Sequence, residues 1–241
     1  MAGRGSRFAD AGFTDPKPLI KFGGKSMIQW VVENIRPTGA HRFIFLCLAE
    51  HLKQYPRLRP QLEQLCPGCI IIPIEQVTEG AACTVLLARK FIDNDDALMI
   101  ANSDQYVEQP IDDYLKHLAE NNADGLIMTF WADHPKWSYC RLRPDGTVAE
   151  VVEKKVISNE ATVGIYNFAR GRDFVTAADA MIASNLRVNG EFYVAPVYNI
   201  LIERGARILT ARISQGDKGM HGLGTPEDLR RFMEKFHLSF D

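Results

Sequence analysis

The sequence lacks long hydrophobic runs, and this absence excludes several classes of protein. No stretch approaches the roughly 18 to 20 consecutive apolar residues that a membrane-spanning helix needs. The N-terminus shows no charged-then-apolar secretion signal. The 28 Lys and Arg residues meet 30 Asp and Glu residues, which gives a net charge of −2. Without an excess of positive charge, we expect no binding to nucleic acid or to an anionic membrane.

Metal-binding patterns of cysteine and histidine are also missing. The chain has five Cys and six His residues, and the histidines show no ligand spacing. An odd number of cysteines without a secretion signal indicates reduced thiols in the cytoplasm. Cys66 and Cys69 form a single C-x-x-C motif with no second pair nearby. It ends a helical run and leads into an apolar strand, which favours a structural role over redox or metal chemistry.

The first half of the chain alternates strand-like and helical segments. The expected elements are a helix at 27–35, a strand at 43–48, interrupted helix at 50–65, a strand at 69–74, a helix at 80–92, a strand at 97–101, a helix at 111–121 and a strand at 125–131. This alternation predicts an α/β fold with a mostly parallel sheet covered by helices. The chain shows no linker or internal repeat, so we expect one continuous domain with a substantial core.

The second half has a different character. The expected elements are a β-hairpin at 139–152, a strand at 161–168, helices at 174–183 and 194–204, and a strand at 207–213. The last helix has a clear start, because Thr225 is a good N-cap and Pro226 suits the first helical position.

A glycine-rich run, Ala2-Gly-Arg-Gly-Ser-Arg-Phe8, opens the chain. It lacks the third Gly of the dinucleotide fingerprint. Gly3 and Gly5 still allow backbone N–H groups to approach phosphate oxygens closely. Taken alone, an ordinary Arg/Gly turn explains the run equally well. Such a loop normally follows a buried strand. Since Met1 falls directly at the loop, we expect either that the natural start lies upstream or that the first strand was lost.

Two prolines flank Lys17 in the next run, Asp15-Pro-Lys-Pro-Leu19. They favour an extended backbone that presents the ammonium group at a fixed point, although a linker proline pair is the alternative. Together the two runs resemble the signature of the nucleotidyltransferases that make sugar nucleotides and CDP-alcohols, A-G-x-G-[ST]-R followed by P-K-P-L.

The resemblance continues in order along nearly the whole chain. The matching segments are Gly23–Met27, Thr78–Ala82, Asn102–Gln105, Trp137–Ser138, Val152–Lys155, Val163–Tyr166, Asn189–Tyr193 and Gly222–Leu229. It implies a single Rossmann-like, GT-A-type, three-layer domain with a mixed, mostly parallel sheet and an added β-hairpin region. It also implies a nucleotide-binding half at 1–130 and an acceptor-binding half at 131–241.

The family chemistry is attack of an acceptor phosphate on the α-phosphorus of a nucleoside triphosphate, with release of pyrophosphate. The acceptor phosphate is already a nucleophile, so catalysis is mostly positioning and charge neutralisation. By resemblance, Arg7 cradles the β and γ phosphates, Lys17 stabilises the α-phosphate, and Asp104 holds Mg²⁺ or Mn²⁺. The implied acceptor is a sugar 1-phosphate or a similar small phosphorylated compound for surface polysaccharide biosynthesis.

The resemblance also implies binding residues. Nucleotide contacts are implied for Ala2, Gly3, Gly5, Ser6, Arg7, Glu75, Gln76, Thr78, Glu79, Gly80 and Ser103. Acceptor contacts are implied for Trp137, Glu153, Lys154, Gly164, Glu191 and Tyr193.

The sequence departs from the family pattern at two places. Gly222 stands where the family has a second metal-binding Asp, and Asp217 is an alternative ligand. Glu79 is unusual beside a nucleotide; its carboxylate could accept from the N–H edge of guanine or from the amino group of cytosine. No base is selected by these residues.

Two other functions remain open. One is a glycosyltransferase that uses an NDP-sugar, with Ser103–Gln105 as a degenerate acidic motif; the chain is similar to small capsule and lipopolysaccharide proteins often labelled family-2 glycosyltransferases. Arg7 and Lys17 argue against it, because such an enzyme needs no polyphosphate loop there. The other is a non-catalytic nucleotide-binding relative, which Gly222 and the missing strand favour. A homodimer is the default assembly.

Overall fold

The computed structural model describes residues 1, 3, 5–213 and 219–240, and the chain divides into two compact units. The first comprises Met1–Val77, Asn102–Ile111 and Met220–Asp241, and the second comprises Thr78–Ala101 and Asp112–Gly219. The predicted functional division at residue 130 follows different bounds and stays a prediction. Within the described ranges, no helix has both the length and the apolar character that crossing a membrane requires.

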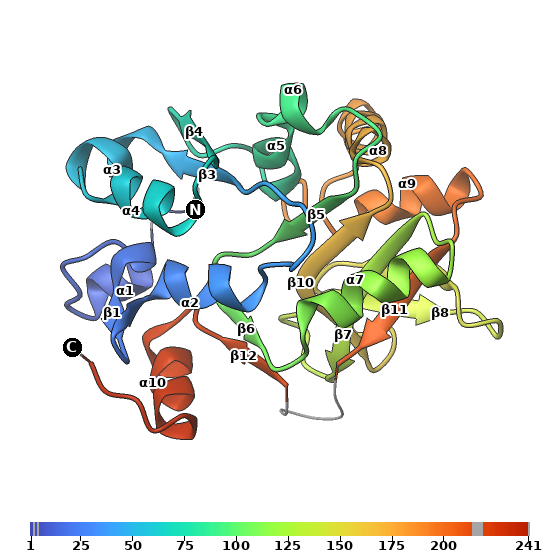
Figure 1. Ribbon diagram of the computed structural model, residues 1–241. Coiled ribbons are helices and arrows are strands. Elements are labelled where there is room, and N and C mark those ends of the chain that lie inside the picture. Colours follow the sequence, from blue (N-terminus) through green and yellow to red (C-terminus); the bar gives the residue numbers. More distant parts are fainter. Residues whose placement is uncertain (2, 4, 214–218, 241) are drawn as a thin grey trace. The chain divides into compact units, whose positions relative to one another are not determined.

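The first unit combines short helices with three small strand pairs (Figure 1). Its helices are α1 (Ser6–Asp10), the 3-10 helix η1 (Lys17–Leu19), α2 (Met27–Asn34), α3 (Ala49–Gln54), α4 (Leu58–Leu65) and α10 (Pro226–Lys235). Its strands are β1 (Lys21–Phe22), β2 (Lys25–Ser26), β3 (Ile44–Leu48), β4 (Ile70–Ile74), β6 (Gln105–Val107) and β12 (Met220–Gly222). β3 pairs with β4 in parallel, whereas β1 with β2 and β6 with β12 are antiparallel.

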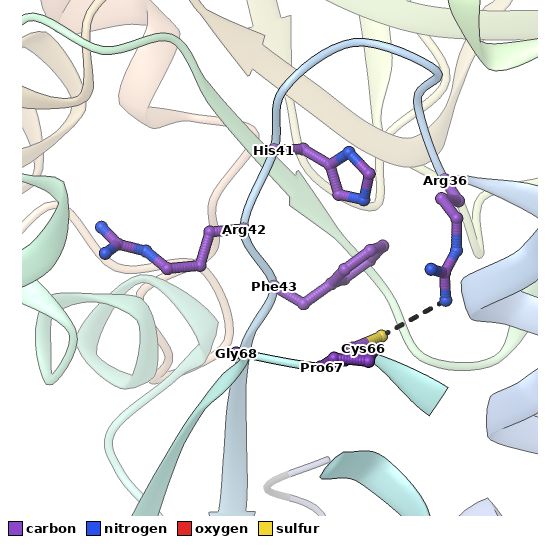
Figure 2. Close-up of a pocket in the computed structure, with 7 residues that line it drawn as sticks. All are labelled: Arg36, His41, Arg42, Phe43, Cys66, Pro67 and Gly68. Atoms are coloured by element: carbon purple, nitrogen blue, oxygen red, sulfur yellow. Dashed lines mark hydrogen bonds between the residues drawn. The ribbon is translucent and has the colours of Figure 1, made fainter. Parts of the chain in front are cut away.

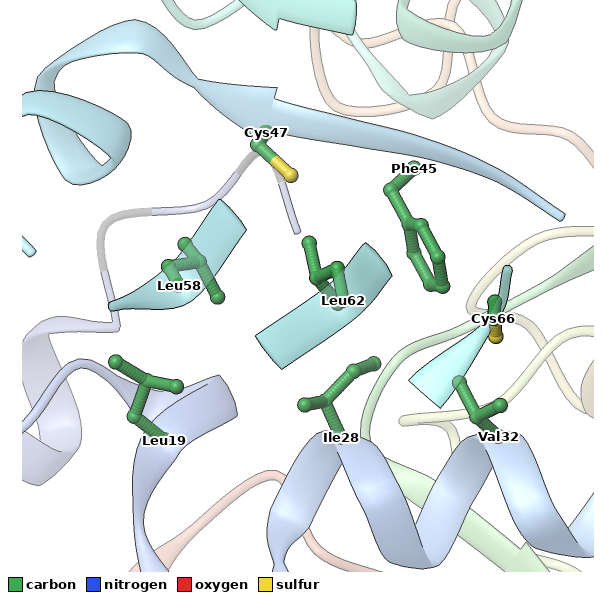
Figure 3. Close-up of a cluster of buried hydrophobic side chains, with 8 residues drawn as sticks. All are labelled: Leu19, Ile28, Val32, Phe45, Cys47, Leu58, Leu62 and Cys66. Carbon is green, nitrogen blue, oxygen red and sulfur yellow. The ribbon is translucent and has the colours of Figure 1, made fainter. Parts of the chain in front are cut away.

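The core of the first unit lies between β3 and the helices α2 and α4. Its buried members are Leu19, Ile28, Val32, Phe45, Cys47, Leu58, Leu62 and Cys66. Figure 3 shows Phe45 and Cys47 of β3 pointing toward the α2 side chains, with Leu62 of α4 between them. Apolar residues spaced four apart on α2 and on α4 place one face of each helix against this cluster.

The second unit is built on a six-stranded mixed sheet. Its strands are β5 (Leu98–Ala101), β7 (Gly125–Trp131), β8 (Tyr139–Leu142), β9 (Val148–Val152), β10 (Glu160–Phe168) and β11 (Ile208–Arg212). Its helices are α5 (Ala81–Leu86), α6 (Arg89–Ile92), α8 (Gly171–Ala183) and α9 (Val197–Glu203), together with α7 (Ile111–Glu120) from its second residue onward. The order β11-β7-β10-β8-β9 forms the main path, and β5 also pairs with β10.

Strand β10 is the centre of this sheet, and all nine of its residues are buried. One edge pairs with β7, while the other pairs first with β8 at Ala161 and then with β5 from Ile165 onward. The register with β7 shifts between Thr162 and Tyr166. Gly164 lies inside this irregularity with φ of 97°, a conformation that glycine adopts without steric cost.

Helices are anchored to the sheet by buried tyrosines. The Tyr198 hydroxyl of α9 donates to the Asn167 carbonyl at 2.8 Å, and its ring stacks on Phe168 with centroids 4.5 Å apart. The Tyr114 hydroxyl of α7 donates to the Leu126 carbonyl at 2.7 Å. Each buried hydroxyl thus has a partner, as burial of a polar group requires.

Two structural expectations need correction. The sheet is mixed, as predicted, but it is not mostly parallel: β11 with β7 is its one parallel pair among the described strands. β10 returns antiparallel to β5, β7 and β8, a pairing that needs no crossover helix. The predicted helix at 80–92 is two helices, because the backbone leaves regular helical geometry at Ala88.

The start of the last helix is confirmed. Thr225 precedes α10 with extended backbone, and its side-chain oxygen accepts from the Asp228 N–H at 3.1 Å. Pro226 occupies the first helical position.

Leu62→Ala should destabilise the first unit by about 2–5 kcal/mol, because its side chain is fully buried in the cluster. Leu87→Ala is the control, since Leu87 is 47% exposed and should cost less than about 0.5 kcal/mol. Urea unfolding of both variants measures the difference; equal costs would show that Leu62 does not support this core.

Candidate functional site

An ion pair between Lys17 and Asp104 is the centre of the candidate phosphate site in the first unit. The Lys17 ammonium donates to Asp104 Oδ2, and the two side chains are 19% and 29% exposed. Lys17 begins η1 directly after Pro16, whose φ of −64° fixes the approach of the chain. Asp104 directly precedes β6. The structure thus brings together two residues that the sequence predicted to be catalytic.

The segment 222–224, which runs from the end of β12 toward α10, lies beside Asp104. The Leu223 N–H donates to the Asp104 carbonyl at 2.7 Å, and Gly222 of β12 pairs with Gln105 of β6. A Cβ placed on Gly224 would lie 3.0 Å from Asp104 Oδ2 and 3.8 Å from Lys17 Nζ. Glycine at 224 therefore leaves space for the carboxylate in its paired position.

The glycine-rich opening run lies next to Lys17 through Gly5. Gly5 has φ of 67° and precedes α1, and a Cβ there would lie 3.5 Å from Lys17 Cβ. Ser6 and Arg7 form the first turn of α1, where both are exposed. Gly3 is exposed as well. Ala2 lies outside the described residues, and so does the proposed alternative metal ligand Asp217.

Other predicted nucleotide residues of the first unit follow strand ends. Glu75 and Gln76 come directly after β4 and are exposed. Ser103 is half-buried beside Asp104. The carboxyl end of a strand is the usual location for ligand-binding groups in open α/β sheets.

The C-x-x-C motif forms a tight turn at the other end of β4 (Figure 2). The Cys69 N–H donates to the Cys66 carbonyl at 3.0 Å, and Gly68 has φ of 79°. Arg36 donates to the Leu65 carbonyl at 2.6 Å and contacts Cys66 Sγ at 3.6 Å. Burial raises the pKa of Cys66 to about 11, so its thiol stays protonated at neutral pH. A protonated thiol is a poor nucleophile and metal ligand, which supports a structural role.

A pocket of about 170 Å³ lies at this turn, lined by Arg36, His41, Arg42, Phe43, Cys66, Pro67 and Gly68. These residues precede β3 and β4, whereas Glu75 and Gln76 of the predicted nucleotide set follow β4. Five residues of strand span about 16 Å. The pocket therefore lies about one strand length from Glu75 and Gln76.

In the second unit, the candidate acceptor residues include a buried carboxyl group. Glu153 is 9% exposed, and Ser138 Oγ donates to its Oε2. Burial raises the pKa of Glu153, and the hydrogen bond from Ser138 opposes that shift. On β10, the Tyr166 hydroxyl lies 3.0 Å from Thr162 Oγ1.

Lys154 and Tyr193 lie together at the same site. The Lys154 ammonium donates to the Tyr193 hydroxyl, and this hydrogen bond raises the pKa of Lys154. The Lys154 N–H donates to the Trp137 carbonyl at 3.1 Å, which joins the two predicted acceptor segments. The Trp137 ring packs edge-on against Phe130 with centroids 5.2 Å apart.

The remaining predicted residues lie around Phe192. Its N–H donates to the Glu79 carbonyl at 2.9 Å, and a Cβ on Gly80 would lie 2.4 Å from the Phe192 carbonyl oxygen. Thr78 Oγ1 donates to the Gly80 carbonyl at 2.8 Å. Glu191 directly precedes Phe192 and is exposed. The structure therefore joins the segment 78–80 to the segment 189–193.

Sequence reasoning did not assign a role to two side chains in the second unit. Ser138 donates to Glu153, whereas the resemblance implies an acceptor contact for its neighbour Trp137. Arg187 pairs with Glu79. It lies 108 residues away in the sequence, so no local motif could connect the two.

Glu153→Gln should alter how stability depends on pH. The folded state holds the Glu153 proton above the ordinary pKa of 4.5, so it binds more protons than the unfolded state in that window. The stability that protonation contributes is present below the unfolded pKa and is lost as the pH rises through the folded pKa. Glutamine cannot ionise and should remove this loss. Urea unfolding between pH 4 and pH 8 tests it; a pH-independent difference between wild type and variant would contradict it.

The comparisons with known proteins agree on one family. The family model described as nucleotidyl transferase matches residues 1–184. The catalytic subunit beta of mannose-1-phosphate guanylyltransferase from Danio rerio is 28% identical over 174 residues, 70% of this chain and 48% of that protein. UTP–glucose-1-phosphate uridylyltransferase from Haloferax volcanii is 24% identical over 238 residues, 94% of this chain and 90% of that protein. The chain spans about half the length of the first curated relatives it matches.

A similar solved structure is the nucleoside-diphosphate-sugar pyrophosphorylase from Vibrio cholerae RC9. Its TM-score is 0.84 at 26% identity, covering 97% of this chain and 98% of that one. UDP-glucose pyrophosphorylase in complex with UDP-glucose shares the fold, with a TM-score of 0.75 at 16% identity, 98% of this chain and 95% of that one. The predicted mixed α/β, Rossmann-like fold is thereby confirmed. With a family match over most of its length, this chain belongs to the nucleotidyl transferase family.

Proposed function

We propose that this chain transfers a nucleoside monophosphate from a nucleoside triphosphate to a small phosphorylated acceptor, such as a sugar 1-phosphate. An acceptor phosphate oxygen bonds to the α-phosphorus, the bond from that phosphorus to the bridging oxygen breaks, and pyrophosphate leaves. The observation that carries the proposal is the Lys17–Asp104 pair beside Gly224. Family membership and the sugar-phosphate substrates in the relatives' names support it.

Lys17 is suited to the α-phosphate because an ammonium group has three donors and its backbone is fixed by Pro16. One donor goes to Asp104 in the structure, and others can reach phosphoryl oxygens. Arg7 would add charge at the β and γ phosphates. Charge that is already oriented before the reaction lowers the barrier without reorganisation.

Asp104 would hold Mg²⁺ or Mn²⁺. Among the residues that the structure describes, no three His, Cys, Asp or Glu side chains gather in a cluster that could hold a metal ion, and position 222 is glycine. Mg²⁺ is commonly bound by one or two carboxylates, with phosphate oxygens and waters as the other ligands. A single carboxylate at Asp104 therefore fits a cation that binds together with the nucleotide and neutralises its phosphates.

The acceptor would bind in the second unit. Lys154 would pair with the acceptor phosphate, and Glu153 and Glu191 would accept from its hydroxyl or amine groups. Trp137 and Tyr193 would supply flat surfaces beside it, while Gly164 lets it approach the backbone of β10. With a sugar phosphate as acceptor, the enzyme would act in the cytoplasm and supply sugar nucleotides for surface polysaccharide biosynthesis.

A screen of the four nucleoside triphosphates against a panel of sugar 1-phosphates, with pyrophosphate detection, tests the proposal directly. Lys17→Ala should lower kcat by about 10²–10³-fold, the cost of removing one preorganised charge from a phosphoryl-transfer site. Lys21→Ala is the matched control, because Lys21 is an exposed lysine of the same unit. Unchanged turnover in Lys17→Ala, or no pyrophosphate with any pair, would refute the proposal.

Gly224→Ala should lower kcat by about tenfold or more while the protein stays folded. The added methyl would lie 3.0 Å from Asp104 Oδ2, so the carboxylate must move by a few tenths of an ångström. Gly39→Ala is the control, because a Cβ at Gly39 meets no atom within 4 Å. Thermal unfolding should be nearly the same for the two variants; wild-type turnover in Gly224→Ala would show that the position of Asp104 is not critical.

A further inference from the structure

The predicted acceptor segment contains a tight hairpin turn in the second unit. Val188 and Glu191 exchange two backbone hydrogen bonds of 3.0 Å. Asn189 and Gly190 lie between them with φ of 48° and 82°, which is the pattern of a type I′ turn. The turn fixes the backbone of Glu191 and directs the chain toward Tyr193. Both side chains belong to the predicted acceptor site.

Arg187 directly precedes this turn and contacts it. Its Nη1 donates to the Gly190 carbonyl at 3.0 Å, and its Nε donates to Asn185 Oδ1 at 2.7 Å. Its guanidinium carbon lies 4.0 Å from the centroid of the buried Phe192 ring. A planar guanidinium that stacks and donates in several directions is held more firmly than a single surface ion pair.

The same guanidinium reaches the predicted nucleotide segment. Arg187 Nη2 donates to Glu79 Oε2, and the Arg187 side chain is 30% exposed. The sequence suggested that the Glu79 carboxylate could accept hydrogen bonds from the nucleobase. The ion pair with Arg187 occupies one of its two oxygens. The Glu79 carboxylate thus has a partner within the protein, and that partner belongs to the acceptor segment.

Backbone contacts hold segment 78–80 independently of Arg187. The Phe192 N–H donates to the Glu79 carbonyl, and the Ala82 N–H donates to the Phe192 carbonyl at 3.0 Å. The Thr84 N–H donates to the Gly80 carbonyl, also at 3.0 Å. Loss of Arg187 should therefore loosen the turn at 188–191 while segment 78–80 keeps its conformation.

We propose that Arg187 is a positioning residue that uses Glu79 as its anchor to hold the acceptor-binding turn in place. This role rests on the proposed function, because it assigns Glu191 and Tyr193 to the acceptor. It makes Glu79 a part of acceptor binding through Arg187, in addition to any contact with the nucleotide.

Steady-state kinetics of Arg187→Ala test the proposal. The KM for the sugar phosphate should rise by about tenfold to 100-fold, because small displacements of positioning groups have effects of this size. The KM for the nucleoside triphosphate should change less than about twofold, since the backbone contacts of 78–80 remain. Arg187→Lys should recover only part of the loss, because it keeps the charge without the planar fork. Arg89→Ala removes an exposed arginine paired with Asp179 and should match wild type.

A double-mutant cycle tests whether Glu79 affects acceptor binding through its ion pair with Arg187 or independently of it. Glu79→Gln should raise the acceptor KM by a smaller factor, and should add nothing when Arg187 is already alanine. Additive effects on acceptor KM, or equal rises in both KM values for Arg187→Ala, would overturn the proposal.

Amide hydrogen exchange gives a measurement that does not depend on turnover. Arg187→Ala should speed exchange at the Val188 and Glu191 amides by about tenfold or more, while the Phe192 amide stays protected. Unchanged exchange at Val188 and Glu191 would overturn the positioning role. Faster exchange there, with no pyrophosphate from any substrate pair even in wild type, would support Arg187 as the restraint on the turn and refute the proposed function instead.

Discussion

A lysine and a carboxylate that are both largely shielded from water need each other, and Lys17 and Asp104 satisfy this requirement across 87 residues of sequence. Removing either would leave the other as an uncompensated, partly buried charge. The pair therefore constrains the segments around it: η1 must deliver Lys17, β6 must follow Asp104, and a side chain at position 224 would displace the carboxylate. The arrangement that keeps the first unit electrostatically balanced also concentrates the groups suited to a phosphoryl site.

The second unit contains a buried carboxyl group, that of Glu153, which has no ion pair comparable to Lys17–Asp104 among the described residues. Glu153 is buried, and among the described residues its side-chain donor is Ser138. Burial raises the pKa of Glu153, and the hydrogen bond from Ser138 offsets only part of that shift. A carboxyl group in such a place has unused acceptor capacity. Hydroxyl or amine groups of an acceptor would supply the missing donors. Lys154, held by Tyr193, gives the same region a positive group for a phosphate. On the proposed function, the first unit would bind a polyphosphate and the second would bind a hydroxylated phosphate ester.

The sequence predicted those features that depend only on neighbouring residues. Thr225 and Pro226 marked the start of α10 because capping involves only adjacent residues, and Gly125–Trp131 was visible as a buried apolar strand. The antiparallel placement of β10 could not be predicted, because apolar runs do not reveal the direction of a strand. The family resemblance located Lys17 and Asp104, which the structure pairs. It could not locate Arg187, because its partner is set by tertiary contacts and not by spacing.

The glycines that carry the resemblance have a physical meaning that differs from one position to the next. A Cβ on Gly3 would meet no atom within 4 Å, so that position places no packing limit on a side chain. Gly80 is the opposite case, because a Cβ would lie 2.4 Å from the Phe192 carbonyl oxygen and would separate two bonded backbones. Gly224 is intermediate, with a flexible carboxylate as its neighbour. Substitution at Gly80 therefore threatens the fold of the second unit, whereas substitution at Gly224 acts first on Asp104.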